Sequence, residues 1–220
     1  MIILDGKKTS NDIKSEIAKE VKKITESGNR PPHLAAVIVG SDGASLTYVG
    51  SKVKACEKVG YESTLIKLPS ETTEDELLNQ VEELNKNDSI DGYIVQLPLP
   101  SHIDTQTILM AIDPDKDVDG FHPTNFGKMS LNLPTFISAT PSGILELLKR
   151  YKVQTEGKNT VVLGRSDIVG KPISILMGLK TNPGNSTVTL AHSRTSNIKN
   201  LTLELSLIHI SEPTRPSSLS

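Results

Sequence analysis

Apolar residues recur at two spacings along this chain, and the two spacings predict alternating helices and strands. From Thr9 to Thr25 they are three or four positions apart, which is typical of an amphipathic helix, and we expect Ser10 or Asn11 to cap it. Residues 34–40 instead form a short continuous apolar run. Such a run is typical of a strand that is covered on both faces.

The same two patterns continue along most of the chain. Further helices are expected over residues 45–59, 73–85, 104–112, 141–150 and 170–179, and further strands over 63–68, 91–96, 159–164 and 186–191. Residues 113–134 are expected to be mostly loop. Strict alternation predicts a parallel sheet with helices on both faces. The expected fold class is α/β, with an N-terminal α/β lobe over residues 1–138 and an incomplete Rossmann-like nucleotide-binding domain over 139–205.

The last fifteen residues, 206–220, break this pattern. They contain two prolines and five serines and show neither helical nor strand periodicity. We expect a non-native tail derived from a sequencing adapter or vector. The regular pattern stops within an α/β unit, so we also expect a truncated chain that is unstable or inactive as written.

Three polar segments stand at the ends of apolar runs and carry side chains that a folded core alone does not require. They are residues 47–52, 95–100 and 116–120. Open α/β sheets bind ligands at the carboxyl ends of their strands, so Lys52, Gln96 and an aspartate of the third segment are expected in one cleft. This arrangement favours an enzyme.

Tyr48 and Lys52 are four residues apart and therefore share one helix face. A lysine that is sheltered from water by an aromatic ring can have a lowered pKa and exchange protons near neutrality. The alternative is a solvated lysine beside a half-buried tyrosine. Gln96 ends an apolar strand before two prolines, so its amide is expected either to contact a ligand or to lie at the surface.

Asp117 and Asp119 flank a valine and precede Gly120, and in an extended segment their side chains point the same way. One carboxylate can accept paired hydrogen bonds from an amino-substituted heterocycle. The alternative is that both aspartates only fold the turn.

Residues 164–172 lie between a predicted strand and a predicted helix, where backbone N–H groups and the helix dipole attract phosphate. The segment departs from the usual G-x-G-x-x-G pattern. Arg165, together with Ser193 and Arg194 after the next strand, favours NADP over NAD because a guanidinium suits the extra phosphate. The alternative is a tight glycine turn with surface arginines.

Composition removes several other classes of function. With 24 basic and 26 acidic residues the net charge is −2, and aromatic residues make up only 3%, so neither nucleic acid nor an anionic membrane is an expected partner. No uninterrupted apolar run approaches the roughly 20 residues that a membrane helix requires, and the start of the chain lacks a signal-type segment, which predicts a cytoplasmic protein. The single cysteine, Cys56, is expected to be a small buried hydrophobe. The histidines lack ligand spacing, so no metal is expected.

Five motifs in a fixed order are similar to those of a known enzyme family. They are Y-V-G-S-K at 48–52, V-Q-L-P-L-P at 95–100, K-D-V-D-G at 116–120, T-P-S-G at 140–143 and G-R-S-x-I-V-G-K-P at 164–172. From residue 1 to about 204 the chain resembles the bifunctional methylenetetrahydrofolate dehydrogenase/methenyltetrahydrofolate cyclohydrolase family. The resemblance implies a folate-binding catalytic domain over 1–138 and a partial NADP-binding domain over 139–205.

The resemblance also implies an activity and a set of residue roles. NADP would oxidise 5,10-methylenetetrahydrofolate to 5,10-methenyltetrahydrofolate, and hydrolysis would then give 10-formyltetrahydrofolate for one-carbon metabolism. Tyr48 would stack on the folate, Lys52 would be the main residue of the hydrolysis, Gln96 would hydrogen-bond Lys52, Asp119 would hold the pterin, and Gly164, Arg165, Ser166 and Ser193 would contact NADP. A full-length protein would be a homodimer. A monofunctional NAD(P)-dependent folate dehydrogenase and a non-catalytic folate- or nucleotide-binding fragment stay open as alternatives.

Overall fold

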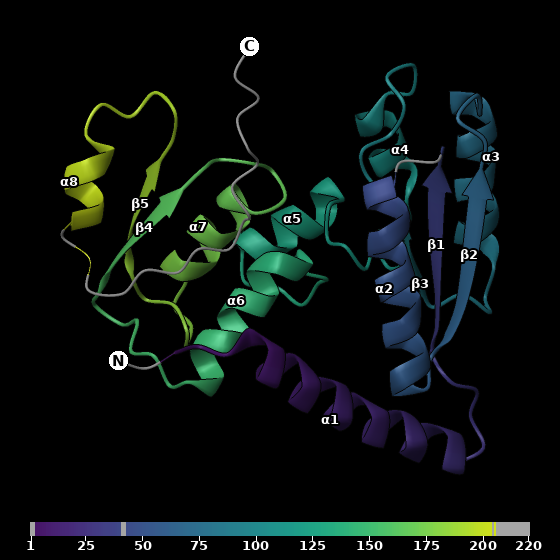
Figure 1. Cartoon of the computed structure of the whole chain (residues 1–220), viewed down its shortest axis with the longest axis horizontal. Coiled ribbons are helices and arrows are strands. Elements are labelled where there is room, and N and C mark those ends of the chain that lie inside the picture. The colour runs from purple at the N-terminus through teal and green to yellow at the C-terminus, as the bar shows by residue number, and fades with distance from the viewer. Residues whose placement is uncertain (1–2, 41–42, 204, 206–220) are drawn as a thin grey trace. The chain divides into compact units, whose positions relative to one another are not determined.

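The structure, a computed structural model, describes residues 3–40, 43–203 and 205 (Figure 1). The tail expected over 206–220 lies outside the described residues. The chain forms two compact units, residues 1–137 and 138–220. Both units combine helices with parallel strands, so the predicted α/β class is confirmed.

The first unit is built on a parallel sheet of three strands. Its strands are β1 (His33–Val39), β2 (Glu62–Leu68) and β3 (Gly92–Val95), in the spatial order β2-β1-β3. Asp117 forms a parallel bridge with Tyr93, so the segment around Asp117 continues the sheet beyond β3. The carboxyl ends of β1 and β3 and the turn after Asp117 therefore lie at one edge of the sheet.

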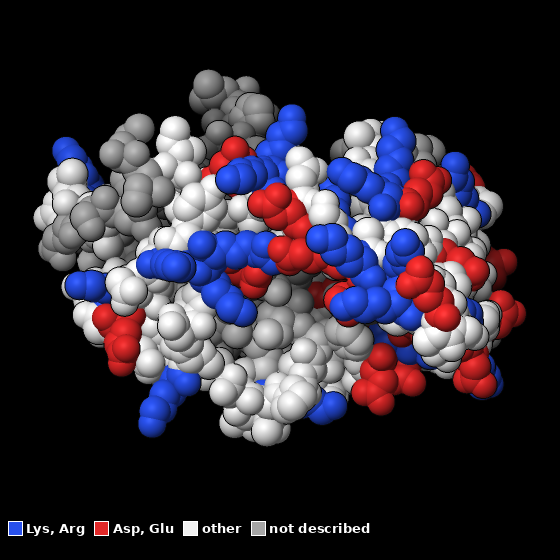
Figure 2. Space-filling model, turned by 90° about the horizontal axis from the view of Figure 1, so that it is seen from below, with Lys and Arg blue, Asp and Glu red and all other residues white. Residues whose placement is uncertain are grey.

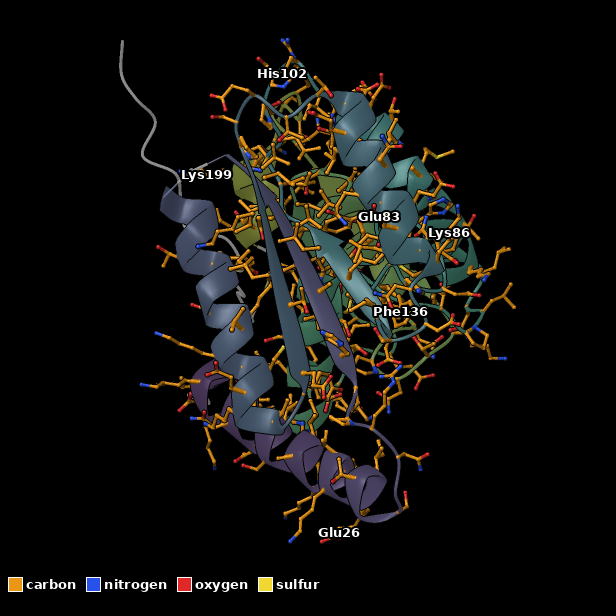
Figure 3. The ribbon with its side chains drawn as sticks, turned by 90° about the vertical axis from the view of Figure 1, so that its right-hand side faces the viewer. Glu26, Glu83, Lys86, His102, Phe136 and Lys199 are labelled. Atoms are coloured by element: carbon orange, nitrogen blue, oxygen red, sulfur yellow. The ribbon has the colours of Figure 1, made fainter. Side chains whose placement is uncertain are left out.

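Helices cover both faces of this sheet. Helices α3 (Glu74–Lys86) and α4 (Thr105–Ala111) cover one face, and α2 (Gly43–Val59) covers the other. Helix α1 (Gly6–Glu26) packs against α2, and α5 (Pro123–Ser130) follows the segment of Asp117. Successive residues of β1 point to opposite faces of the sheet. Val37 belongs to a core cluster with residues of α3 and α4, whereas Ile38 belongs to a second cluster with Val49 of α2. Both clusters consist of buried apolar side chains, as the continuous apolar run of β1 predicts. Glu83 and Lys86 lie on the exposed side of α3 (Figure 3).

One local prediction for the first unit is wrong, and another missed a short helix. The side chain of Asp5, and not of Ser10 or Asn11, caps α1 by accepting a hydrogen bond from the N–H of Lys8. The segment expected to be mostly loop contains α5, which begins with Pro123. The ring of His122 caps this helix by accepting from the N–H of Thr124 at 3.1 Å, and proline suits the first helical turn.

The second unit contains the predicted β-α-β motif. Its elements are α6 (Ala139–Arg150), β4 (Asn159–Leu163), α7 (Gly170–Gly178), β5 (Thr187–Ala191) and α8 (Ile198–Leu203). Strands β4 and β5 pair in parallel, with Asn159 opposite Thr187 and Leu163 opposite Ala191, and α7 packs against both strands. The loop from β4 to α7 therefore lies at the carboxyl edge of this sheet.

Candidate active site

Helix α2 presents a tyrosine and a lysine that interact with each other. The Lys52 Nζ lies 5.1 Å from the centre of the Tyr48 ring, as the four-residue spacing predicts for one helix face. Tyr48 is 59% exposed, whereas the Lys52 side chain is only 27% exposed. The ring therefore leaves apolar surface open to a ligand, while the ammonium is largely withdrawn from water.

The ammonium of Lys52 faces the carboxylate of Asp119. Lys52 Nζ and Asp119 Oδ1 are 3.8 Å apart. Burial lowers the pKa of Lys52, although the charge of Asp119 opposes this shift. Burial also raises the pKa of Asp119; the charge of Lys52 opposes that shift and the charge of Asp117 adds to it. Both shifts favour the uncharged forms, so Lys52 can exchange a proton closer to neutrality than an exposed lysine can.

Gln96 follows directly after β3, and its side-chain oxygen accepts no hydrogen bond. Its backbone N–H donates to Val37 O at 2.8 Å, and its side-chain Nε2 donates to Leu97 O at 2.7 Å. Its Oε1 is buried and has no hydrogen-bond partner. The hydrogen bond to Lys52 that the resemblance implies is therefore not formed in this structure. An unpaired buried carbonyl is unfavourable, and a donor from a ligand or from Lys52 would satisfy it.

The two aspartates of the K-D-V-D-G segment have different partners. Asp117 is 2% exposed, and its Oδ2 accepts hydrogen bonds from His122 N at 2.8 Å and Asn125 Nδ2 at 2.9 Å. Asp119 instead faces Lys52. The sequence left open whether one carboxylate binds a ligand or both only fold the turn, and the family resemblance pointed to Asp119 for the pterin. The structure brings only Asp119 to the lysine, and Asp117 holds the turn.

Val118 keeps these two carboxylates in place by packing against a glycine. A Cβ on Gly92 would lie 2.3 Å from Val118 Cγ1, so only glycine leaves room for this contact. The backbone N–H of Tyr93 donates to Lys116 O at 3.0 Å and fixes the register. Strand β3 thus positions the segment that carries Asp119.

In the second unit, the loop between β4 and α7 folds tightly, so that the backbone of Gly170 lies against the backbone of Gly164 and Arg165. Gly164 has φ +114°, and its N–H donates to Ala191 O at 2.8 Å. A Cβ on Gly170 would lie 2.3 Å from Gly164 O. Ser166 Oγ accepts from the N–H of Gly170 at 3.2 Å, inside the turn. This cradle at the start of α7 suits the phosphates of a dinucleotide.

Arg165 and Ser193 are exposed residues of the predicted cofactor site, as Ser166 is. Arg165 follows Gly164 after the end of β4, and Ser193 follows His192 after the end of β5, so both lie at the carboxyl edge of the second sheet. The N–H groups of His192 and Arg194 bond to side chains within their own turn, which fixes the loop that carries Ser193. Both residues therefore lie at the edge where open α/β sheets bind ligands.

In the first unit, Asn125 of α5 contacts the site, and the sequence analysis did not single it out. It is 1% exposed and donates to Asp117, yet it lies in a stretch expected to be loop. An asparagine on the buried face of a short helix becomes noticeable only once α5 is recognised.

Cys56 is 6% exposed, and burial raises the pKa of its thiol, which makes it a poor nucleophile.

Two negative findings apply to the part of the chain that the structure describes. Within residues 3–40, 43–203 and 205, no group of three or more His, Cys, Asp or Glu side chains is placed to hold a metal ion. Over the same residues, no helix combines the length and the apolar character that crossing a membrane requires.

A lysine–carboxylate pair at the edge of one parallel sheet and a glycine cradle in a β-α-β motif together define a two-unit α/β enzyme with a nucleotide-binding domain. Residues 4–119 match the catalytic domain of the tetrahydrofolate dehydrogenase/cyclohydrolase family, and residues 138–211 match its NAD(P)-binding domain. The chain belongs to this family.

Named relatives and solved structures agree with this assignment. The chain is 69% identical to the bifunctional protein FolD of Flavobacterium psychrophilum over 208 residues, which are 94% of this chain and 71% of that protein. The corresponding protein of Flavobacterium johnsoniae is 66% identical over 94% of this chain and 70% of its own length. The crystal structure of the Campylobacter jejuni bifunctional enzyme FolD has a TM-score of 0.86 and 42% identity, covering 90% of this chain and 69% of that one. A Trypanosoma brucei FolD complexed with NADP cofactor and inhibitor has a TM-score of 0.84 and 34% identity, covering 91% and 68%.

Proposed function

We propose that this chain oxidises 5,10-methylenetetrahydrofolate to 5,10-methenyltetrahydrofolate with NADP and hydrolyses the product to 10-formyltetrahydrofolate. The observation that carries the proposal is the half-buried Lys52 held between the Tyr48 ring and the Asp119 carboxylate. Residues 1–138 are the folate-binding catalytic domain, and residues 139–205 are part of the NADP-binding domain. The reaction belongs to one-carbon metabolism. A cytoplasmic homodimer is part of the same proposal.

The second unit offers residues that fit NADP. Gly164 and Ser166 lie in the cradle at the start of α7, where the absence of a Cβ on Gly170 lets the backbone approach closely. Arg165 binds the extra phosphate of NADP, and Ser193 contacts the ribose. When bound, NADP supplies the acceptor for the hydride of the methylene bridge.

Lys52 assists the hydrolysis as a neutral amine. Water attacks the methenyl carbon and forms a C–O bond while Lys52 takes one proton from this water. That proton then passes to the nitrogen whose C–N bond breaks, and the remaining hydroxyl releases its proton to solvent as the formyl C=O forms. A neutral amine is favoured because a second positive charge beside the methenyl cation costs energy. Tyr48 stacks on the folate, and Asp119 accepts hydrogen bonds from the pterin. The Oε1 of Gln96 has no partner in this structure, and during the reaction it accepts an N–H of Lys52 and orients the amine.

Two separate assays test this proposal. Loss of methenyl absorbance without NADP measures hydrolysis, and NADPH absorbance measures oxidation of the methylene substrate. Oxidation without hydrolysis would identify a monofunctional dehydrogenase. Binding of folate or NADP without either reaction would identify a non-catalytic binding fragment.

The rate of methenyl hydrolysis is expected to rise with pH, with an inflection below 10.5, the ordinary pKa of lysine. The sign follows from burial, which lowers the pKa of Lys52 and so increases the fraction of neutral amine at a given pH. Initial rates are measured against pH, with the uncatalysed rate subtracted. Asp119→Asn removes the charge that opposes the shift and is expected to move the inflection to lower pH. An inflection at or above the ordinary value contradicts the neutral-amine role.

Arg165→Ala is expected to weaken NADP binding by about 10-fold to 100-fold, because a hydrogen bond to a charged group contributes about 1.5–3 kcal/mol. Binding of NAD, which lacks the extra phosphate, is expected to change little. Titration calorimetry measures both dissociation constants. Lys158→Ala is the matched control, because Lys158 is exposed and precedes β4, at the opposite end of the strand from Arg165. Equal losses for NADP and NAD would assign Arg165 to another part of the nucleotide.

A further inference from the structure

The side chain of Asn125 connects α5 to two other segments of the first unit, the one with Pro114 and Asp117 and the one with Thr135. Its Nδ2 donates to Pro114 O at 2.8 Å and to Asp117 Oδ2 at 2.9 Å. Its Oδ1 accepts from Thr135 Oγ1 at 2.7 Å. The side chain is 1% exposed. A fully buried carboxamide is tolerated only when it is hydrogen-bonded, and here both of its ends are used.

Both groups that accept from Asn125 lie on the segment that leads to Asp119. Pro114 and Asp117 are the two points at which this segment meets α5. The turn then closes through the N–H of Gly120, which donates to Asp117 O at 3.1 Å, and Gly120 has φ +68°. Asp119 lies inside this turn, so the place of the Asp117 carboxylate determines where the Asp119 carboxylate points.

The chemistry of the contact explains why an asparagine is needed at this position. Asp117 Oδ2 accepts from two neutral N–H groups, the amide of Asn125 and the backbone of His122. An apolar side chain of similar size would fill the space but would leave Asp117 and Pro114 O without this donor. An aspartate would have the same shape but would place a second carboxylate against the first.

We propose that Asn125 is a positioning residue that holds the Asp117–Gly120 turn so that the Asp119 carboxylate faces the Lys52 ammonium. Asn125 acts through Asp117 and does not touch the substrate. The inference rests on the proposed function, because it assigns Asn125 to the lysine–carboxylate pair of the folate site.

Asn125→Asp tests this role. The substitution keeps the shape of the side chain but turns the donor toward Asp117 and Pro114 into an acceptor. A displacement of about 1 Å at a reacting group can reduce a rate about 100-fold, and we expect a loss of this size in kcat for methenyl hydrolysis. The dissociation constant of NADP is expected to stay unchanged, because its proposed residues lie in the second unit.

Thr135→Val is the matched control. It removes the hydroxyl that donates to Asn125 Oδ1 but leaves both Nδ2 bonds in place. We expect hydrolysis to stay within about threefold of the unsubstituted chain even if the melting temperature falls, since the loss of one hydrogen bond costs stability. A purely structural role for Asn125 predicts instead that activity follows melting temperature in both variants, and that outcome overturns the proposal.

The double variant Asn125→Asp with Asp117→Asn tests the contact itself. It reverses donor and acceptor between the two positions and removes the repulsion between two carboxylates. We expect it to recover at least about tenfold of the activity that Asn125→Asp loses. Failure to recover any activity, in a protein that melts cooperatively, contradicts positioning through Asp117. If Asn125→Asp does not fold, Asn125→Ser removes the carboxamide without adding charge, and full activity in that variant overturns the proposal.

Competitive labelling of Lys52 with a small amine-reactive reagent separates this proposal from the proposed function. In the unsubstituted chain Asp119 opposes the lowering of the Lys52 pKa. Displacing the carboxylate in Asn125→Asp is therefore expected to make Lys52 more reactive at a given pH, whereas Lys54, exposed on the same helix, stays unchanged. An unsubstituted chain without either reaction would refute the proposed function alone. Unchanged labelling of Lys52 in Asn125→Asp would refute the positioning role alone.

Discussion

Lys52→Met is expected to abolish methenyl hydrolysis while reducing hydride transfer less. Methionine has a similar length and fills the space beside the Tyr48 ring, but it cannot take or give a proton. Proton transfer by a positioned side chain contributes about 100-fold to 10,000-fold to a rate, so the loss should reach at least this range. Hydride transfer keeps the proposed folate contacts of Tyr48 and Asp119 and loses only the contribution of Lys52 to binding. The two assays of hydrolysis and NADPH formation measure the split.

Lys54→Met is the control for this substitution. Lys54 lies on the same helix and is exposed, so its replacement removes one charge and adds one apolar side chain without touching the Lys52 environment. Both activities are expected to persist. Equal loss of hydrolysis and hydride transfer in Lys52→Met would show that Lys52 serves binding or folding, and the acid–base role would then be wrong.

The periodicity of apolar residues was sufficient to predict the strands and most helices because each element buries a distinct pattern. The run that forms β1 is apolar on both faces, and both faces are covered. Helix α5 was missed because Pro123 and Gly127 lie in eight residues that lack a long apolar stripe. Its stability depends on tertiary contacts, such as the buried Asn125, which local sequence does not reveal.

The parts of the site that depend on local helix geometry could be predicted from the sequence. Four-residue spacing on a helix was enough to bring Tyr48 to Lys52. The resemblance singled out Asp119, but the spacing of the two aspartates alone could not separate their roles, because these depend on the contact of Val118 with Gly92 and on donors from α5. The Gln96 side chain also follows a local preference, since it donates to the neighbouring Leu97 O and leaves its own oxygen without a partner.

Figure 2 gives a physical reason why recognition has to be local in this protein. Over the first unit, at the right of the view, basic and acidic side chains are interspersed, in agreement with the net charge of −2. Such a surface has no extended field of one sign to attract an anionic ligand. This agrees with the proposal that NADP is held by individual groups, the backbone cradle and Arg165, and not by a general field.

Gly170→Ala is expected to remove measurable NADP binding. The added Cβ would lie 2.3 Å from Gly164 O, 2.7 Å from Gly164 C and 2.9 Å from Arg165 Cα. All three atoms belong to the backbone or are fixed to it, so no change of rotamer relieves the contact. The turn has to open, which displaces Arg165 and breaks the bond from Gly170 N to Ser166 Oγ. Calorimetric titration with NADP measures the loss.

Gly178→Ala provides the control within the same helix. A Cβ on Gly178 would meet only Val188 Cγ2 at 3.9 Å, which is an ordinary contact, so NADP binding is expected to persist. In Gly170→Ala, methenyl hydrolysis without NADP should persist as well, because Lys52 and Asp119 belong to the first unit. The expected pattern is thus the reverse of that for Lys52→Met, where NADP binding stays and hydrolysis disappears. Normal NADP binding by Gly170→Ala would contradict the assignment of the cradle, and loss of hydrolysis in that variant would show that the two units are not independent in function.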